Sequence, residues 1–592
     1  DFGNKGFAIV GASAKVYGGD VQFDGGPQPD GSMRFSGRGT LSADGLRRAG
    51  DLGAASRIAA SLSGQTTYGA NLAFVRGQTE MSVTSNLVGL GSSLPAPLAK
   101  AAEASLPLRF QIGLDPTPPG QPARDTLRFE LGNVVQAVYQ REHAPDGVRV
   151  LRGGIGVQEP APSPASGVAA NINLKTLVVD EWDALADRLT AGSPPGREGV
   201  ESGGYVPDAI SLHVQELAMG PRRLTNVSAG LSQEPGGPWR ANVDSDQLNG
   251  YLEYRPPQRR AGAAAAGGRV YARLSRASLP KSEVEQVETL LEQQPSTLPA
   301  LDVVIDDFEL RGKHLGRLEM EALNRATPQG RDWQLTRLAM TTPEATLTAS
   351  GHWAASGPLP PRGSGQAVPR RSVMDFKLAL SDSGAFLNRL GTSNAIRGGK
   401  GQLSGQIAWD GSPFSLDYPS LGGQVNVAIE SGQFLKAEPG AARLLGVLSL
   451  QSLPRRLSLD FRDLFQEGFA FDDITGDVAI AQGVARTNNL RMRGVQAVVL
   501  MEGSADVARE TQDLRVVVVP EINAGTAALA YAVINPAVGL GAFLAQVLLK
   551  KPLTQAGTRE FHVSGPWADP KVERVERPAA SADAASSAPR RE

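Results

Sequence analysis

The sequence predicts a mainly β protein in which many short strands form a long, rolled and twisted antiparallel sheet with few short helices. Apolar and polar residues alternate with a period of two along most of the chain, as in Leu403, Gly405 and Ile407. Turn pairs such as Asp410-Gly411 separate these runs. Twisted sheets of many strands curl, so we expect this sheet to roll along its length and to enclose an inside.

The composition restricts the classes of function. The 592 residues include 59 basic and 61 acidic side chains, and the net charge of −2 gives no global attraction to nucleic acid or to an anionic membrane. The chain has no cysteine, and its five histidines show none of the spacings typical of metal sites. Its sequence contains no phosphate-binding loop and no nucleophile elbow. We therefore expect no enzyme, no metal, no cofactor and no nucleic-acid partner.

The chain divides into two β regions and a tail. The first predicted region covers residues 1–278. We place a soft boundary at Leu279, where LPKSEVEQVETLL opens a helical stretch, and the second region covers residues 279–577. Residues 578–592 are predicted to be disordered. The chain starts at Asp1 and enters alternating sequence at once, so we expect it to be a fragment of a longer protein.

Two short helices are predicted from their termini. Ser282 and Glu285 form a capping box, and Pro295 ends the helix that follows. Asp382 is placed to cap a second helix, which Gly391 ends at a position that favours a left-handed backbone. Ordinary packing against the sheet is the favoured role of such helices, and closing an end of the rolled sheet is the alternative.

Near the C-terminus, 28 consecutive residues from Ile522 to Leu549 (522–549) carry no charge. The run is long enough to cross a bilayer, but Asn535-Pro536 divides it, which predicts a broken helical hairpin. Three interpretations stay open: a buried helix pair, a membrane-contacting or groove-capping element, and a transmembrane span. The candidates for membrane contact lie in the second arm and just after it, and they are Phe543, Leu544, Leu548, Lys550 and Lys551.

Several segments share their order and spacing with one known family. They include SNLVGLGSSLPAPLAK, LPALDVVIDDFELRGKHLGRLEMEA, DSGAFLNRLG, GGKGQLSGQIAW and the block RLLGVLSLQSLPRRLSLDFRDLFQEG. Together these segments resemble the YhdP type of the AsmA-like envelope protein family, within the AsmA/TamB/YhdP superfamily. The resemblance is densest from Leu298 onward and covers much of the chain.

The resemblance implies a taco-like fold, in which the long rolled sheet has an apolar groove. It implies a protein that crosses the periplasm of a Gram-negative cell, anchored to the inner membrane by an N-terminal helix that this fragment lacks. The implied function is non-enzymatic phospholipid transport toward the outer membrane, with this chain as the central and the outer-membrane-proximal C-terminal groove regions. The implied partners are phospholipids, the membrane at that end and envelope proteins at either end.

Strand alternation supplies candidates for the lining of the groove. Apolar residues on each strand share one face, where they would contact acyl chains while the headgroup stays in water. The candidates are Leu403, Ile407, Val425, Val427, Ile429, Leu457, Leu459, Phe461, Val478 and Ile480. A closed and packed core is the alternative role of the same residues.

Two other functions stay open. A structural or assembly scaffold of the cell envelope would use the same sheet with a closed interior. A solenoid carbohydrate enzyme would need two carboxylates facing each other, whereas those of Asp306-Asp307 point to opposite faces of a strand. A charged cluster in the matching block either supports a helix at the end of the sheet or contacts headgroups, and it consists of Arg443, Arg455, Arg456, Asp460, Arg462 and Asp463.

Overall fold

The computed structural model of the chain contains two compact units. The first comprises Asp1–Pro256 with Ala272–Ala277, and the second comprises Pro257–Tyr271 with Ser278–Glu592. The structure describes residues 2–3, 6–75, 78–118, 120–145, 147–190, 204–220, 222–234, 236–256, 268–280, 298–327, 330–356, 369–392, 394–413, 416–435, 470–494, 497–520, 534–548 and 558–575.

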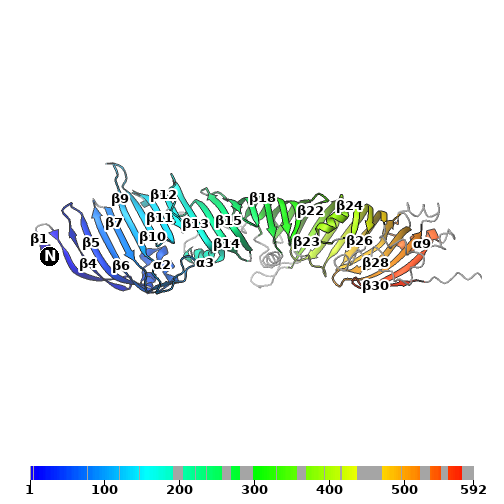
Figure 1. The fold of residues 1–592 in the computed structure, drawn as a ribbon, viewed down its shortest axis with the longest axis horizontal. Coiled ribbons are helices and arrows are strands. Elements are labelled where there is room, and N and C mark those ends of the chain that lie inside the picture. The colour runs from blue at the N-terminus through cyan, green and yellow to red at the C-terminus, as the bar shows by residue number, and fades with distance from the viewer. Residues whose placement is uncertain are drawn as a thin grey trace, which may run out of the picture. The chain divides into compact units, whose positions relative to one another are not determined.

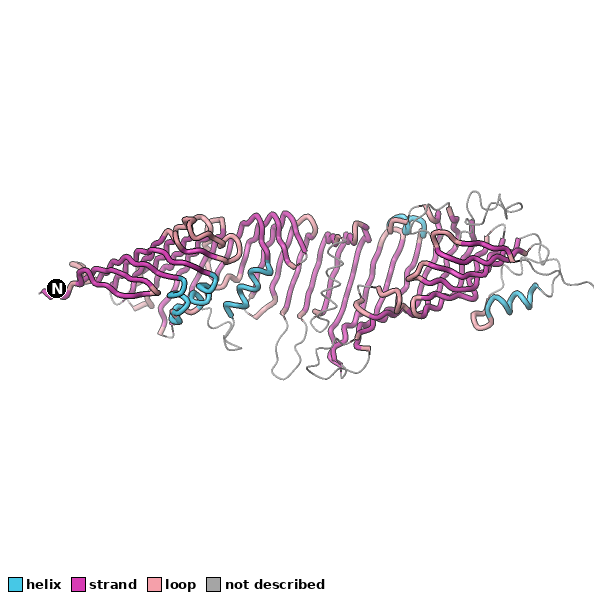
Figure 2. Tube along the Cα trace, turned by 90° about the horizontal axis from the view of Figure 1, so that it is seen from below, coloured by secondary structure: helices cyan, strands magenta, loops and turns pink. Residues whose placement is uncertain are grey.

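In the first unit, most strands pair with the strand that follows them in the chain (Figure 1). The strands are β1 (Phe2–Gly3), β2 (Gly6–Phe7), β3 (Ile9–Val16), β4 (Gly19–Pro27), β5 (Met33–Ser42), β6 (Leu62–Val75), β7 (Gln78–Ser85), β8 (Leu90–Ser92), β9 (Leu108–Asp115), β10 (Arg124–Leu131), β11 (Val135–Ala144), β12 (Gly147–Val157), β13 (Gly167–Val178), β14 (Ala209–Met219), β15 (Arg222–Gln233), β16 (Trp239–Asp244), β17 (Leu248–Arg255) and most of β18 (Arg269–Leu279). Helices lie along one edge of these strands (Figure 1, Figure 2), and they are α1 (Ala43–Arg48), α2 (Ala54–Ile58) and α3 (Val179–Thr190), with short 3-10 turns at Gly50–Leu52 and Ala59–Ser61.

Two strand pairs in the first unit are parallel, so the prediction of a wholly antiparallel sheet is wrong. β12 pairs in parallel with β13, and β13 pairs in parallel with β14. A parallel pair requires a connection that carries the chain from the end of one strand back to the level at which that strand began, where the next strand starts. Between β13 and β14 that connection contains α3. Between β12 and β13 the connection passes close over Gly154 and Gly156. A side chain at either glycine would collide with the backbone of the connection, near Pro162 or Glu159, so the close approach requires glycine.

In the second unit, every described pair from β19 to β31 is antiparallel. The elements are β19 (Ala300–Leu310), β20 (Lys313–Thr327), β21 (Gly330–Thr341), β22 (Ala345–Ala355), β23 (Arg370–Leu380), α5 (Ser383–Arg389), β24 (Ile396–Asp410), β25 (Gly422–Phe434), β26 (Ala470–Ala481), β27 (Val484–Arg493), β28 (Ala497–Asp506), β29 (Thr511–Pro520), α9 (Gly539–Leu548), β30 (Arg559–Pro566) and β31 (Lys571–Arg574). Long strands with few helices confirm the mainly β class.

The predicted helix after Asp382 is confirmed as α5. The Asp382 carboxylate accepts a hydrogen bond from the Ala385 backbone N–H, and Gly391 has a φ of 92° after the last turn. Arg389 of α5 donates two hydrogen bonds to Glu344, with N···O distances of 2.9 and 2.7 Å. These bonds tie the helix to the β21–β22 turn. The predicted helix at Ser282 and the charged cluster in the Arg443 to Gly468 block lie outside the described residues, as does the tail at 578–592.

Only the second half of the uncharged segment 522–549 is described. Asn535 forms the turn before α9, because its carbonyl oxygen accepts hydrogen bonds from Val538 and Gly539. Leu540 of α9 is fully buried against β28 and β29. Among the described residues, none of the helices has the length and apolar character needed to span a bilayer.

Candidate functional site

One face of the second unit is apolar across neighbouring strands, and we call it the second apolar face. From β19 to β25, side chains that lie directly opposite one another form an unbroken aliphatic and Met row. The row consists of Ile305, Leu318, Met340, Leu347, Leu378, Leu403 and Val427. At ~4.8 Å between strands, its seven members span about 29 Å. From β21 to β25 these side chains are half-buried, so part of their apolar surface is accessible.

The structure brings seven of the predicted lining residues together on the second apolar face. Leu403 lies opposite Val427, and Val425 lies opposite Val478. The seven are Leu403, Ile407, Val425, Val427, Ile429, Val478 and Ile480, and all are half-buried. The other three predicted lining residues lie outside the described residues, and they are Leu457, Leu459 and Phe461.

Toward β27 to β30 the same face becomes a packed core. Met492, Val499, Met501 and Val516 are at most 1% exposed and belong to one buried cluster with Phe434. Val427 and Ile429 pack against the border of this cluster. β27 to β30 therefore form a closed core, whereas β21 to β25 keep accessible apolar surface.

The first unit has an equivalent surface, which we call the first apolar face. Across β5, β6, β7, β9, β10 and β11, directly opposed side chains form the row Phe35, Leu72, Met81, Ile112, Leu127 and Tyr139. A second row continues from β9 to β16 as Leu108, Leu131, Val135, Val157, Ile172, Leu212, Ala229 and Val243. In the first row only Tyr139 is buried, and Phe74 on the same face is 42% exposed.

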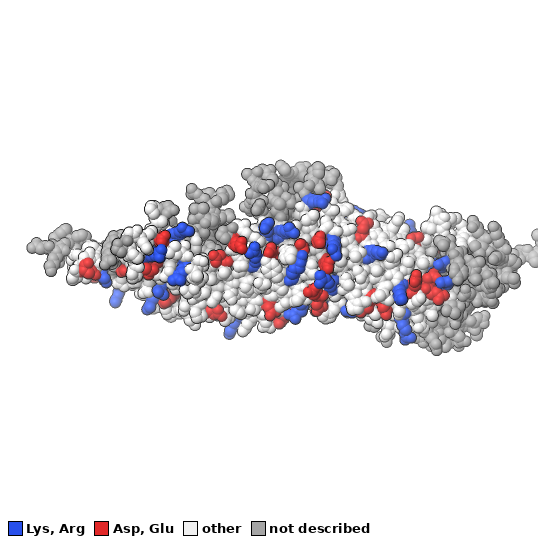
Figure 3. Space-filling model, turned by 90° about the horizontal axis from the view of Figure 1, so that it is seen from above, with Lys and Arg blue, Asp and Glu red and all other residues white. Residues whose placement is uncertain are grey.

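Outside the apolar patch of β28 and β29 that α9 covers, the opposite faces of both units are mostly polar, because successive side chains on a strand point to opposite faces. In the first unit the opposite row is Ser36, Asn71, Ser82, Gln111 and Arg128. In the second unit, mostly polar side chains line a hollow of about 1230 Å³, in which Arg515 donates hydrogen bonds to Glu560 and Glu502. On the surface drawn in Figure 3, basic and acidic side chains are interspersed. Each unit therefore separates an apolar from a polar face.

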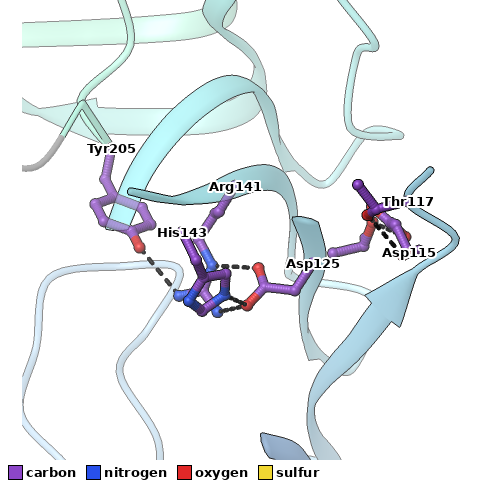
Figure 4. A network of polar contacts seen from close by, with 7 residues as sticks. Asp115, Thr117, Asp125, Arg141, His143 and Tyr205 are labelled. Carbon is purple, nitrogen blue, oxygen red and sulfur yellow. Dashed lines mark hydrogen bonds and ion pairs between the residues drawn. The ribbon is translucent and has the colours of Figure 1, made fainter. Parts of the chain in front are cut away.

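A buried ionic network lies at one end of the first apolar face (Figure 4). Asp125 is 1% exposed and accepts hydrogen bonds from Arg141 Nε and Nη2 at 2.7 and 2.8 Å. His143 Nε2 lies 2.8 Å from the same carboxylate, and Arg141 also donates to the Tyr205 hydroxyl at 3.1 Å. Tyr139 donates to the Tyr205 carbonyl at 3.0 Å, which joins the network to the apolar row.

Burial alone would raise the pKa of Asp125, but the hydrogen bonds from Arg141 and His143 outweigh it and hold the pKa below its ordinary value. The carboxylate is therefore charged at neutral pH although it is buried. Strand alternation by itself does not indicate this network. The sequence feature that indicates it is a charged residue at a position of the apolar face on each of two strands. Asp125 shares a face of β10 with Leu127, and Arg141 shares a face of β11 with Tyr139.

The candidates for membrane contact are described only in part. Phe543 of α9 is half-buried and packs with Leu540 against a cluster on β28 and β29 that includes Val498 and Val517. This cluster lies on the face opposite Val499 and Val516, so α9 covers the reverse of the packed core. The side chains of Leu544, Leu548, Lys550 and Lys551 lie outside the described residues.

The fold and the two apolar faces define a class: a mainly β protein whose sheets present extended apolar surface beside a separate polar face. Within the part of the chain that the structure describes, no group of three or more His, Asp or Glu side chains is placed to hold a metal ion. The family model described as "YhdP protein" matches residues 1–572, and the chain belongs to this family. The chain is also 25% identical over 554 residues to the intermembrane phospholipid transporter YhdP of Escherichia coli (strain K12). That match covers 87% of this chain and 39% of the relative's length.

Proposed function

We propose that this chain is a conduit for phospholipid, which moves between the inner and outer membranes of a Gram-negative envelope with its acyl chains against the apolar faces. The observation that carries the proposal is the unbroken apolar row from Ile305 to Val427, half-buried from β21 to β25. The name of the Escherichia coli relative supports phospholipid as the cargo. It also supports a location in the periplasm, because that relative is named an intermembrane transporter.

The energetics explain why such a conduit needs no catalytic group. Transferring ~30 methylene groups of a phospholipid into water costs roughly 25 kcal/mol, at ~0.8 kcal/mol for each group. An apolar row of Leu, Ile, Val and Met removes most of this cost, while the headgroup remains in water. The protein then lowers the barrier by solvation alone.

We extend the proposal to the lining residues Leu457, Leu459 and Phe461, and to membrane contact by the segment that ends at Lys550 and Lys551.

The experiment compares lipid bound to the purified chain and to two matched double variants. Leu403→Asp with Val427→Asp places two opposed carboxylates on the second apolar face. Gln402→Asp with Ala428→Asp places two opposed carboxylates on the other face of the same strands. Each protein is purified gently from bacterial cells and examined by native mass spectrometry with lipid extraction.

We expect phospholipid on the parent and on the Gln402/Ala428 variant, and its loss from a folded Leu403/Val427 variant. Equal lipid on all three proteins would contradict the proposed path. A parent free of lipid would instead support the envelope scaffold, in which the sheet has a structural role only.

A further inference from the structure

A wholly apolar pocket of about 300 Å³ opens on the first apolar face. It is lined by Pro97, Leu98, Val135, Val157, Ile172, Leu174, Leu177, Val179 and Trp182. Val135, Val157 and Ile172 are consecutive members of the apolar row described above, so the pocket is continuous with that face. The remaining walls come from α3 and from the segment around Leu98.

Contacts outside the pocket hold α3 in place over it. The Asp180 carboxylate accepts a hydrogen bond from the Gly220 N–H at 2.7 Å, which fixes the start of the helix to the β14–β15 turn. Leu185 is buried, whereas Asp183 and Arg188 on the outer surface of the helix are exposed. The helix therefore has its own anchors and does not need to collapse onto the strands to bury its apolar side.

The lining chemistry restricts what the pocket can hold. An open apolar pocket leaves its lining in contact with water, and covering that lining with an apolar ligand is favourable by roughly 25 cal/mol per Å² of buried apolar surface. Trp182 is the only one of the nine lining side chains that carries a polar atom, so a headgroup or a peptide backbone would lose its hydrogen bonds inside. An apolar occupant is therefore favoured.

The volume restricts the occupant further. At ~30 Å³ for a group the size of a water molecule or a methylene, the pocket accommodates about ten such groups. That is part of one acyl chain, and it is too little for the two chains of a phospholipid. Building on the proposed function, we propose that this pocket holds the end of one acyl chain under α3, so that lipid pauses at a defined station on the first apolar face.

The test uses a phosphatidylethanolamine whose acyl chain ends in a diazirine. The tracer is carried in vesicles of phosphatidylethanolamine and phosphatidylglycerol, the whole chain is photolabelled, and adducts are mapped by mass spectrometry. Ile172→Trp fills the pocket, and Asn173→Trp is the matched control on the exposed opposite face of the same strand. Val179→Trp fills the pocket from α3 and is used if Ile172→Trp does not fold by circular dichroism.

We expect parent adducts at Trp182 or Leu174 and also on the second apolar face, at Leu403 or Val427. Filling the pocket should lower the Trp182 and Leu174 adducts about tenfold, a difference that corresponds to ~1.4 kcal/mol in binding, and should leave the second apolar face labelled. The Asn173→Trp control should match the parent.

Parent label on the second apolar face without label at Trp182 or Leu174 would overturn the pocket and leave the proposed function standing. Unchanged Trp182 label in a folded, pocket-filled variant would also overturn it. Absence of label on both apolar faces would overturn the proposed function together with the pocket.

Discussion

Replacing Asp125 with alanine tests whether the ionic network fixes one end of the first apolar face (Figure 4). The change removes both hydrogen bonds that Arg141 donates to the carboxylate, together with the contact to His143. The Arg141 side chain is only 11% exposed, so its guanidinium would stay buried with the Tyr205 hydroxyl as its remaining partner in the network. An uncompensated buried charge is among the most destabilising changes that a single substitution makes.

We expect Asp125→Ala to destabilise β10 and β11 by ~3–5 kcal/mol, the cost of breaking a buried pair by removing one partner. Asp125→Asn keeps the shape and one acceptor, so its cost should be smaller. The pKa of Asp125 lies below its ordinary value, so the stabilisation is present above the ordinary carboxyl pKa of 3.8. It is lost as the pH falls through the lower, folded-state pKa.

Hydrogen exchange of the β10 and β11 amides is the suitable assay, because neighbouring strands of an extended sheet open locally and a single unfolding transition is not assured. The control is Glu234→Ala, which removes an exposed partner of Arg240 and should be nearly neutral. If Asp125→Ala changed the local opening free energy by less than ~1 kcal/mol, the network would not have the buried-pair energetics assigned to it.

Three further predictions concern the second unit, and hydrogen exchange or limited proteolysis checks each of them. Hydrogen bonds from Arg389 hold the pKa of Glu344 at about 2, below its ordinary 4.5, so Glu344→Gln should reduce α5 protection above about pH 5 and make progressively less difference as the pH falls through about 2. Asp382→Ala should destabilise α5 by ~1 kcal/mol through loss of its N-terminal cap. Asp382→Asn should cost much less, because the Asn side chain keeps an oxygen that accepts the capping hydrogen bond. Leu540→Ala should destabilise the packing of α9 against the sheet by ~2–5 kcal/mol, because Leu540 is fully buried. Val538 is 54% exposed, so Val538→Ala should change the stability little.

Each of these predictions has an outcome that contradicts it. A pH-independent effect of Glu344→Gln would show that its hydrogen bonds with Arg389 do not stabilise α5 through the carboxylate charge. Equal exchange of α5 in the parent and in Asp382→Ala would remove the cap from the account of that helix. Proteolysis of α9 that Leu540→Ala leaves unchanged would mean that burial against β28 and β29 does not hold α9 in place.

Strand identity and the apolar phase were predictable from the sequence because both are local. A period of two fixes which residues of one strand share a face, and this places Leu403 with Ile407, and Val425 with Val427 and Ile429, before any pairing is known. The α5 cap is local in the same sense. Parallel pairing of β12, β13 and β14 was not predictable, because alternation is the same in both pairing modes and the connections decide between them.

Helix α3 and the Asp125 network were missed for different reasons. Trp182, Leu185 and Leu189 follow helical spacing, but the helix continues directly from the apolar end of β13 without a Ser, Thr or Asn cap to mark its start. The network depends on register, since Asp125 and Arg141 are 16 residues apart and meet only because β10 and β11 pair as they do. A charge in the apolar phase of two successive strands is the signal that would have suggested it.

Glycines opposite aromatic residues let large rings pack closely against the sheet on both apolar faces. Gly153 lies opposite Tyr139 in the first unit, and Gly432 lies opposite Phe471 in the second. Each aromatic ring packs over the glycine of the neighbouring strand. A Cβ at that glycine would collide with the ring, so the absence of a side chain there makes the packing possible. A ring in this position contributes apolar area without projecting away from the sheet. Tyr139 is 7% exposed and Phe471 is 3% exposed, so these two glycines serve the close packing of covered parts of the apolar faces.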